Sequence, residues 1–280
     1  MIENIKSLLV AMSKEFGPEE SSSVLGYGLS LAQEAGAHLT VQAASQSIHL
    51  RNQDVNRTIG GLVGAANERL RQLAHAAVET ARSDAAAAGV SATVHNPHLP
   101  YPALVDSFLG LARVHDLAIL DAEPEAIHPD RDLLQALLVN SGRPLIVVPV
   151  GWDTFRAQRI LIAWDGSSRA SRAVHDALPF LRAAQAVKVV VVTGEKELPA
   201  SADGSDIAPH LARHGVPVEV TSAAARDGDV AQALRGEAER EGADMIVMGG
   251  YVHSRLRELV FGGVTQSLLK SSPVPLLMSY

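Results

Sequence analysis

The sequence predicts an α/β fold made of two tandem domains, each a five-stranded parallel sheet with helices on both faces. Short apolar segments alternate with helix-like segments along the whole chain, an order typical of parallel sheets with crossover helices. The same order occurs twice, most clearly in residues 115–122 and 243–250, where an Asp precedes four apolar residues. We therefore expect domains at residues 1–150 and 157–280, joined by a linker near residues 151–156.

Five strands and three helices are predicted in the first repeat. The strands are residues 7–12, 38–43, 90–95, 117–120 and 144–149, and the helices are residues 24–35, 62–88 and 103–113. Serines at positions 21–23 are suited to cap the first helix, and Gly36 and Gly89 end the first two. Three prolines within residues 96–102 predict a rigid turn, because proline lacks a backbone donor and cannot continue a helix or an inner strand.

The second repeat has the same order of strands. They are residues 159–163, 187–193, 216–221, 245–248 and 273–278. The repeats differ most after the second strand, where the first repeat has a long helix and the second has a short polar segment at residues 195–206. A uniformly apolar strand closes each repeat, and such a strand at a sheet edge would invite aggregation. We expect each closing edge to be covered, either by a strand of the other repeat or by a helix.

Composition limits the class of protein. The chain has 280 residues, of which 47% are hydrophobic, so it can bury a large core. The net charge of −7 disfavours binding to nucleic acid or to an anionic membrane. Without cysteine there are no disulfides and no thiolate metal sites. Neither a signal-peptide pattern nor an apolar run of about 18 residues is present, so we expect a soluble, cytoplasmic protein.

The most informative stretch is residues 245–269. Four apolar residues form the predicted strand, and Gly249 and Gly250 follow where it leaves the sheet. A second pair, Gly262 and Gly263, precedes an apolar-periodic helix. Glycine at a helix start lets backbone N–H groups approach a ligand closely, and the helix N-terminus favours an anion there. The stretch therefore indicates a strand, a phosphate-sized loop and a helix, although the Gly-Lys-Ser/Thr of a Walker loop is absent.

This stretch resembles the universal stress protein family, in which Gly, two residues, Gly, nine residues and Gly with Ser or Thr follow the fourth strand. Gly249, Val252 and Gly262 stand at the three glycine positions, and Gly263 stands at the Ser/Thr position, so the chain departs from the pattern twice. The resemblance implies an adenine nucleotide α hydrolase-like, Rossmann-like fold with strands one and four adjacent. It also implies that the closing strands pair into an intramolecular pseudo-dimer, and it leaves room for a homodimer.

In nucleotide-binding members of the family this region holds ATP or AMP, with magnesium accompanying ATP. The resemblance implies Asp165 as the ribose acceptor. It further implies Ala163 and Trp164 beside adenine, Val191 against the base, Met248 and Gly249 beside the ribose, and Val252, Gly262, Gly263, Val264 and Thr265 along the phosphates. The first repeat lacks this site, because Ser13 and Asp121 stand at the corresponding strand ends and a carboxylate repels phosphate.

Several of these positions also have a purely structural explanation. Asp165-Gly166-Ser167 is an ordinary turn and helix cap as well. Val252 should weaken nucleotide binding, either as a β-branched residue at positive φ or by placing methyl groups near the phosphates, so Val252→Gly should strengthen it. Arg255 and Arg257 could supply positive charge to the loop or simply be solvated.

Other chemistry has little support in the sequence. His95 with His98, and His210 with His214, have ligand-compatible spacing, but no third ligand is recognisable beside either pair, so we expect no metal site. No nucleophile motif or carboxylate pair indicates an acid–base enzyme. We therefore expect ligand sensing or stress response through protein partners, without turnover. An interaction scaffold that binds no nucleotide and a slow ATP hydrolase are the alternatives.

Overall fold

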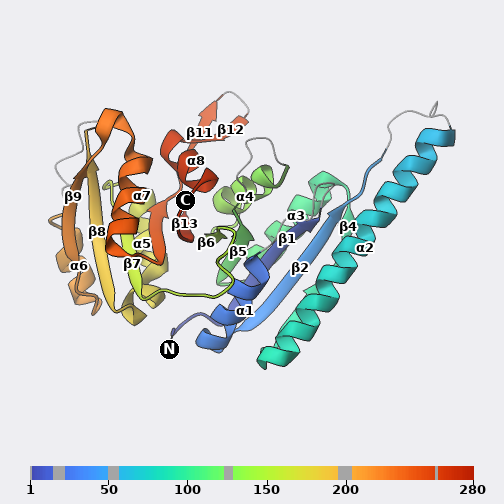
Figure 1. The fold of residues 1–280 in the computed structure, drawn as a ribbon, viewed down its shortest axis with the longest axis horizontal. Helices are drawn as coiled ribbons and strands as arrows, with labels where there is room; N and C mark the ends of the chain where they lie inside the picture. The colour runs from blue at the N-terminus through green and yellow to red at the C-terminus, as the bar shows by residue number, and fades with distance from the viewer. Residues whose placement is uncertain (1, 15–22, 50–56, 123–128, 195–203, 256–257) are drawn as a thin grey trace.

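The computed structural model describes residues 2–14, 23–49, 57–122, 129–194, 204–255 and 258–280. Hydrogen bonds join eleven strands into one sheet that crosses the molecule along its long axis, with helices on both faces (Figure 1). The order is β3-β2-β1-β5-β6-β13-β10-β7-β8-β9, and β4 pairs with β2 beside this path. The order shows two halves that mirror each other about the β6–β13 pair.

The first repeat supplies one half of the sheet. Its strands are β1 (Ser7–Lys14), β2 (His38–Gln46), β3 (Ala92–His95), β4 (His98–Leu99), β5 (Leu117–Asp121) and β6 (Leu145–Val148). Its helices are α1 (Val24–Ala35), α2 (Arg57–Ala88), α3 (Tyr101–Ala112) and α4 (Pro129–Asn140). The helices α1 and α2 share the core on one face of the sheet, and α3 and α4 share the core on the other.

The second repeat supplies the other half. Its strands are β7 (Arg159–Ala163), β8 (Ala186–Thr193), β9 (Glu219–Ala224), β10 (Met245–Gly249) and β13 (Leu276–Ser279). Its helices are α5 (Ser168–Ala183), α6 (Ile207–Arg213), α7 (Val230–Glu241) and α8 (Gly263–Lys270). A separate antiparallel hairpin of β11 (Val252–Arg255) and β12 (Glu258–Phe261) lies between β10 and α8. The predicted tandem α/β fold with strands one and four adjacent is confirmed in both halves.

The two halves meet at their closing strands. β6 and β13 pair antiparallel, with Leu145 opposite Met278 and Val147 opposite Leu276. All four side chains are buried. The β6–β13 pairing therefore leaves neither closing strand as an exposed apolar edge, where it could pair with another chain and aggregate. The predicted pairing of the closing strands is confirmed, and the alternative of a helix over each edge is wrong.

The long helix α2 shows how the sequence pattern produces packing. Its buried residues fall three or four positions apart, so they form one stripe facing β2 and β3. They are Leu70, Ala74, Val78, Ala81 and Ala85. Gly89 follows the helix in the left-handed conformation, with φ of +66°. The helix begins five residues before the predicted start at residue 62, and its end at Ala88 agrees with the prediction.

Three local predictions differ from the structure. Within the predicted turn at residues 96–102, His98 and Leu99 form the short strand β4. α3 starts at Tyr101, because the proline that follows falls in the first helical turn, where no backbone donor is needed. The third strand of the second repeat is β9, which starts at Glu219 rather than at Val216. Val216 is buried and donates its N–H to the Leu211 carbonyl, so it closes α6 instead.

The segment joining the repeats is packed rather than extended. Phe155 is buried, and its ring lies 5.5 Å from Tyr27 of the first repeat and 5.9 Å from Phe180 of the second, measured between centroids. Trp152 donates its indole N–H to the Pro273 carbonyl at 3.1 Å. The predicted linker therefore fixes the two repeats against each other. No helix in the described part of the chain is long and apolar enough to cross a membrane.

Candidate functional site

The candidate site lies where β7 and β10 leave the sheet. These strands are neighbours, with Ala163 opposite Met248, so the segments that follow them start next to each other. Ala163 also pairs with Val190, and the Trp164 N–H donates to the Val190 carbonyl at 2.9 Å. The predicted positions Ala163, Trp164 and Met248 therefore lie at the carboxyl edge of the sheet, and Val191 follows Val190 on the neighbouring strand. Ala163 and Met248 face the core under α7 and α8, whereas Trp164 faces the core under α5. Ligands of open parallel sheets bind at such an edge, where the strand order reverses.

Asp165 is exposed on the turn that follows β7. Its Oδ1 accepts the Ser167 N–H at 2.9 Å, and Gly166 takes the left-handed conformation with φ of +72°. Ser167 caps α5, because its Oγ accepts the Ala170 N–H at 3.1 Å. Both parts of the structural explanation are thus present. A carboxylate oxygen has more than one lone pair, so the same side chain can also accept a ligand hydroxyl.

Trp164 contains a polar atom that the fold leaves unsatisfied. The indole Nε1 is buried and has no hydrogen-bond partner among the described residues. Its ring packs against the apolar core on the α5 side of the sheet. A buried donor without a partner costs about 1–3 kcal/mol. An acceptor supplied by a ligand at this edge would remove that cost.

Gly249 is required by packing in the protein alone. A Cβ added there would lie 2.7 Å from the Ala170 backbone nitrogen and 2.8 Å from the Arg169 carbonyl carbon. Those atoms belong to the first turn of α5, so β10 and α5 approach more closely than any side chain would allow. Gly250 is similar, because its Cβ would meet the Leu138 side chain of the first repeat at 2.5 Å. This glycine pair therefore does not by itself indicate a ligand.

The second glycine pair behaves differently. Gly262 is the N-cap residue of α8, and none of the described side chains caps this helix. A Cβ on Gly263 would meet no atom within 4 Å, so the first turn of α8 is open. Tyr251 ties this helix to the end of β10: it accepts the Gly262 N–H at 2.7 Å and donates its own to Thr265 Oγ1 at 3.1 Å. Thr265 is buried, and Val264 is half-buried beside it.

Arg169 joins this group although no sequence motif pointed to it. Its guanidinium lies 4.7 Å from the centre of the Tyr251 ring and 4.5 Å from that of Tyr280. It also donates to the Tyr280 hydroxyl at 3.2 Å. The Tyr251 ring in turn packs on Gly262, whose Cβ would lie 2.6 Å from Cδ1. A positive charge is therefore held between two aromatic rings, and one of these rings, that of Tyr251, contacts Gly262 at the start of α8.

The segment between the glycine pairs corrects one prediction. A loop was expected there, but Val252 pairs with Phe261 in the β11–β12 hairpin. A β-branched residue is favoured in a strand, so the expected backbone strain at Val252 has no basis. The Val252 and Arg255 side chains and the whole of Arg257 lie outside the described residues, so their predicted roles stay predictions.

The corresponding edge of the first repeat is occupied by the protein itself. Asp121, at the end of β5, accepts the N–H groups of Ser23 and Val24 with Oδ1 at 3.1 and 3.0 Å. It therefore caps α1 from a neighbouring strand. The carboxylate that was expected to repel phosphate thus has a structural task of its own. The side chain of Ser13 lies outside the described residues.

The two histidine pairs have other partners. His98 Nδ1 bonds Ser45 Oγ at 2.8 Å, whereas His95 is exposed. The rings of His210 and His214 lie 4.8 Å apart, and His214 Nδ1 is 3.2 Å from the Arg182 guanidinium. Within the described residues, no group of three or more His, Cys, Asp or Glu side chains could hold a metal ion.

Known proteins share both sequence and fold with this chain. A sequence profile described as "Universal stress protein family" matches residues 156–279. The stress response protein NhaX of Bacillus subtilis (strain 168) is 40% identical over 52 residues, which are 19% of this chain and 31% of that protein. The match thus spans less than a third of that relative's length.

Solved structures match the whole chain. A universal stress protein from Archaeoglobus fulgidus DSM 4304 covers 97% of this chain and 97% of its own, with a TM-score of 0.70 and 16% identity. A putative universal stress protein from Pseudomonas aeruginosa UCBPP-PA14 covers 99% of this chain and 93% of its own, with a TM-score of 0.57 and 15% identity. A universal stress protein solved in complex with cAMP aligns with only 44% of this chain, at 18% identity and a TM-score of 0.33. That likeness is too low to carry its ligand over.

Sequence and fold agree on the family. The profile match lies in the second repeat, which also contains the candidate site. The full-length structures share the tandem arrangement of both repeats. Residues 156–279 therefore match the universal stress protein family, and the chain as a whole has the tandem fold of solved universal stress proteins.

Proposed function

We propose that this protein is a cytoplasmic stress-response protein that senses a ligand, and that the ligand is one adenine nucleotide, ATP or AMP, bound in the second repeat. The observation that carries the proposal is the N-terminus of α8. It begins with a glycine pair, no side chain of the described residues caps it, and a Cβ at Gly263 would meet none of their atoms within 4 Å. Unpaired N–H groups at a helix start, together with the helix dipole, favour a phosphate.

The surrounding residues match the rest of a nucleotide. The Arg169 guanidinium adds positive charge beside α8. The exposed Asp165 carboxylate accepts hydrogen bonds, as ribose hydroxyls require. The buried Trp164 Nε1 would gain an acceptor from the base or the sugar. Magnesium accompanying ATP would bind mainly through phosphate oxygens and water, as this ion usually does.

Two observations favour a second candidate, an interaction scaffold without nucleotide. Gly249 is explained by its contact with α5, and Asp165 and Ser167 by the turn they form. These features would be present in a family member that no longer binds nucleotide. What distinguishes the two candidates is whether the open N-terminus of α8 takes a phosphate.

Tryptophan fluorescence tests the proposal. The chain has two tryptophans, and Trp152→Phe leaves Trp164 as the only indole. AMP, or ATP with magnesium, should then change the Trp164 emission. Asp165→Ala should weaken binding about tenfold, which corresponds to about 1.4 kcal/mol. Gly263→Asp should abolish binding, because it places a carboxylate at the phosphate position.

Gly263→Ala is the matched control, since its Cβ meets nothing and the N–H groups stay in place. It should bind more tightly than Gly263→Asp, because it adds no negative charge. Emission that stays constant up to about 10 mM nucleotide, beyond even a millimolar Kd, would favour the scaffold. So would a Gly263→Asp variant that binds normally. Release of inorganic phosphate measured in the same samples addresses hydrolysis, and sustained release would contradict a role without turnover.

A further inference from the structure

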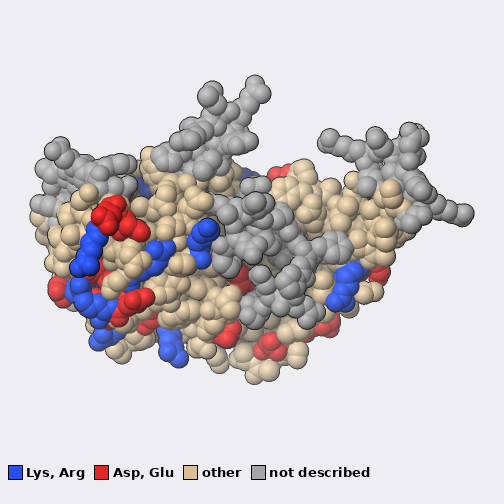
Figure 2. Space-filling model, turned by 45° about the horizontal axis from the view of Figure 1, so that its top comes forward, with Lys and Arg blue, Asp and Glu red and all other residues tan. Residues whose placement is uncertain are grey.

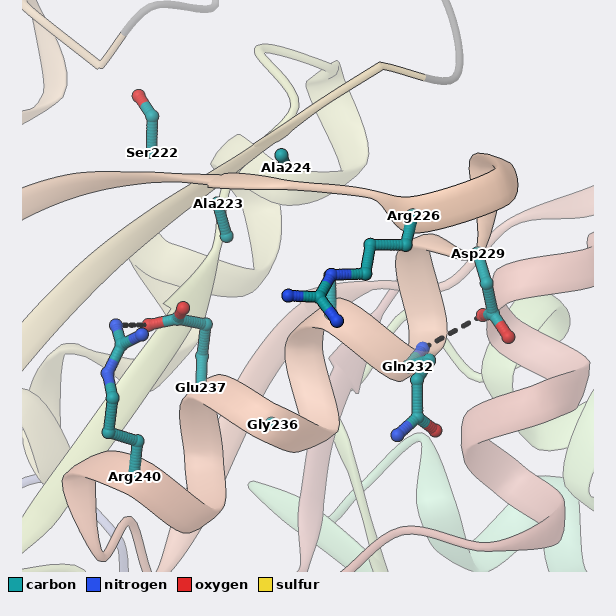
Figure 3. A pocket seen from close by; sticks show the side chains of 10 residues that line it. Ser222, Ala223, Ala224, Arg226, Asp229, Gln232, Gly236, Glu237 and Arg240 are labelled. Atoms are coloured by element: carbon teal, nitrogen blue, oxygen red, sulfur yellow. Dashed lines mark hydrogen bonds and ion pairs between the residues drawn. The ribbon is translucent and has the colours of Figure 1, made fainter.

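Each repeat has a groove at the outer end of the sheet, between its third strand and the helix that follows. In the second repeat the groove lies between β9 and α7 and has a volume of about 480 Å³ (Figure 3). In the first repeat the corresponding groove lies between β3 and α3 and has a volume of about 570 Å³. The two are equivalent in position, because β3 and β9 end the two mirrored halves of the sheet. Their linings are different.

The groove of the second repeat is lined by charged side chains. Arg240 pairs with Glu237, and the Asp229 carboxylate accepts the Gln232 N–H at 2.9 Å, while Arg226 extends over the groove (Figure 3). Lys, Arg, Asp and Glu also lie close together at this end of the molecule, on the left in Figure 2. Opposite charges within the groove largely satisfy one another, so it does not indicate a particular ligand.

The groove of the first repeat contains an unsatisfied amide. Gln42 of β2 lines it, and its side chain is 98% buried, with a relative exposure of 2%. Its Oε1 accepts the Ser107 hydroxyl at 3.2 Å, and its buried Nε2 has no partner among the described residues. Exchanging the two amide atoms would keep the bond to Ser107, since a hydroxyl can donate or accept.

The other repeat shows that the fold does not require a polar residue here. Val41 pairs with Val10 of the first strand, as Val189 pairs with Ile162, so the residues that follow, Gln42 and Val190, are equivalent. Val190 is fully buried. A buried amide with an unpaired end costs about 1–3 kcal/mol relative to a satisfied one. A ligand that pairs with the amide would offset this cost.

We propose that the groove between β3 and α3 is a second ligand site, which binds a small neutral molecule carrying a carbonyl next to an N–H. The carbonyl would accept from the Gln42 amide at the floor. The neighbouring N–H would donate to Ser107 Oγ or to the carboxylate of Asp106, which also lines the groove. Pro97 and Leu111 supply apolar walls for the body of such a ring. The cyclic amide edge of a pyrimidine base has this arrangement of groups.

The lining also argues against an anionic ligand. It contains no Lys or Arg, and Asp106 contributes a negative charge. Gly110 has no side chain to close the outer side of the groove, and a Cβ there would meet no described atom within 4 Å. The site therefore differs in charge from the phosphate position at α8, and it does not depend on the nucleotide proposal.

Side-chain amide resonances provide the test, with uracil as the probe. In the ¹⁵N-labelled full chain, the Gln42 Nε2 resonances are identified by their loss in Gln42→Leu. They should shift on addition of uracil at millimolar concentration. 1,3-Dimethyluracil, which keeps both carbonyls but has no N–H, should bind more weakly. Gln42→Leu should weaken uracil binding at least tenfold, and Ser107→Ala should weaken it several-fold.

Gln232→Leu is the matched control, because it removes an amide from the equivalent groove of the second repeat. It should leave uracil binding unchanged. Ser107→Ala keeps the test decisive if Gln42→Leu does not fold. Gln42 resonances that do not move at about 10 mM uracil would overturn the proposal and point to a buried water as the partner. Unaltered binding by the Gln42 or Ser107 variants would overturn it as well.

Discussion

The two repeats use the same position in the fold in opposite ways. At the end of the fourth strand, Asp121 of the first repeat reaches the first turn of α1 and caps it with a carboxylate. At the same place in the second repeat, Gly249 lets the strand backbone touch the first turn of α5, which Ser167 caps instead. The same place in the fold therefore serves helix capping in one repeat and close backbone packing in the other. Under the proposed function, the repeat without this carboxylate is the one that takes the phosphate.

The second strand repeats this contrast on the other side of the sheet. Thr40 and Gln42 place polar groups under α3, and Thr40 Oγ1 bonds the buried His115 at 2.8 Å. Lys188 takes the position of Thr40, and its ammonium reaches out to Glu241 at 2.8 Å. The first repeat thus buries two polar side chains where the second has a buried valine and a lysine paired with a carboxylate. The two repeats share one fold, so the differences between their candidate sites come from the residues that stand at equivalent positions.

The largest effect is expected at Gly249. Gly249→Ala would put a methyl group within 2.7–2.8 Å of the α5 backbone. The atoms that the methyl group meets belong to the backbone, which cannot move aside as the end of a flexible side chain can. β10 and α5 must therefore move apart. Unfolding in urea should show a loss of about 2–3 kcal/mol in stability, the upper range for overpacking.

Gly263→Ala separates this packing effect from the general cost of replacing glycine. The added methyl group meets nothing, and alanine is the better helix former by about 1 kcal/mol in a helix interior. Its stability should therefore be unchanged or slightly higher. Equal losses for the two variants would show that close approach of β10 to α5 is not what Gly249 provides.

A smaller effect is expected at the equivalent position of the first repeat. Asp121→Ala removes the acceptor for two N–H groups of α1 and should cost about 1–2 kcal/mol, as lost helix caps do. Asp121→Asn keeps an amide oxygen and should cost less. Thermal and urea unfolding of both variants measure this. If Asp121→Ala is as stable as the parent, the cap does not contribute and the two strand ends do not differ as described.

Much of the architecture could be predicted because it rests on local pattern. The apolar runs of β10 and β13, and the stripe of α2, carry their periodicity in the sequence. The β11–β12 hairpin was missed because the glycine spacing suggested a loop, and spacing does not reveal strand pairing. The start of β9 was misplaced because Val216 is apolar for a different reason, closure of α6.

The site was predictable only in part. The residues at the exits of β7 and β10 could be placed, since adjacent strands bring their ends together. Arg169 could not, because its contact with Tyr280 joins residues 111 positions apart. The unsatisfied amide of Gln42 was likewise invisible, because it depends on which atoms of α3 reach it. Contacts of this kind arise from tertiary packing and leave no periodic signal.

The smallest expected effect concerns β4, a strand that the first repeat has and the described part of the second does not show. Burial, reinforced by the nearby Arg71 guanidinium, lowers the pKa of His98 below its usual 6.5. The folded protein therefore keeps this imidazole neutral where the unfolded chain takes up a proton. Because the unfolded state binds more protons in that window, stability should fall as the pH drops from about 6.5 toward the folded pKa.

His98→Asn, which can keep the bond to Ser45, should flatten the fall in melting temperature between pH 7.5 and 5.5. His75→Asn, which removes an exposed histidine of α2, is the matched control. If the melting temperature depends on pH identically in His98→Asn and the parent, protonation of His98 does not contribute to the pH dependence of stability.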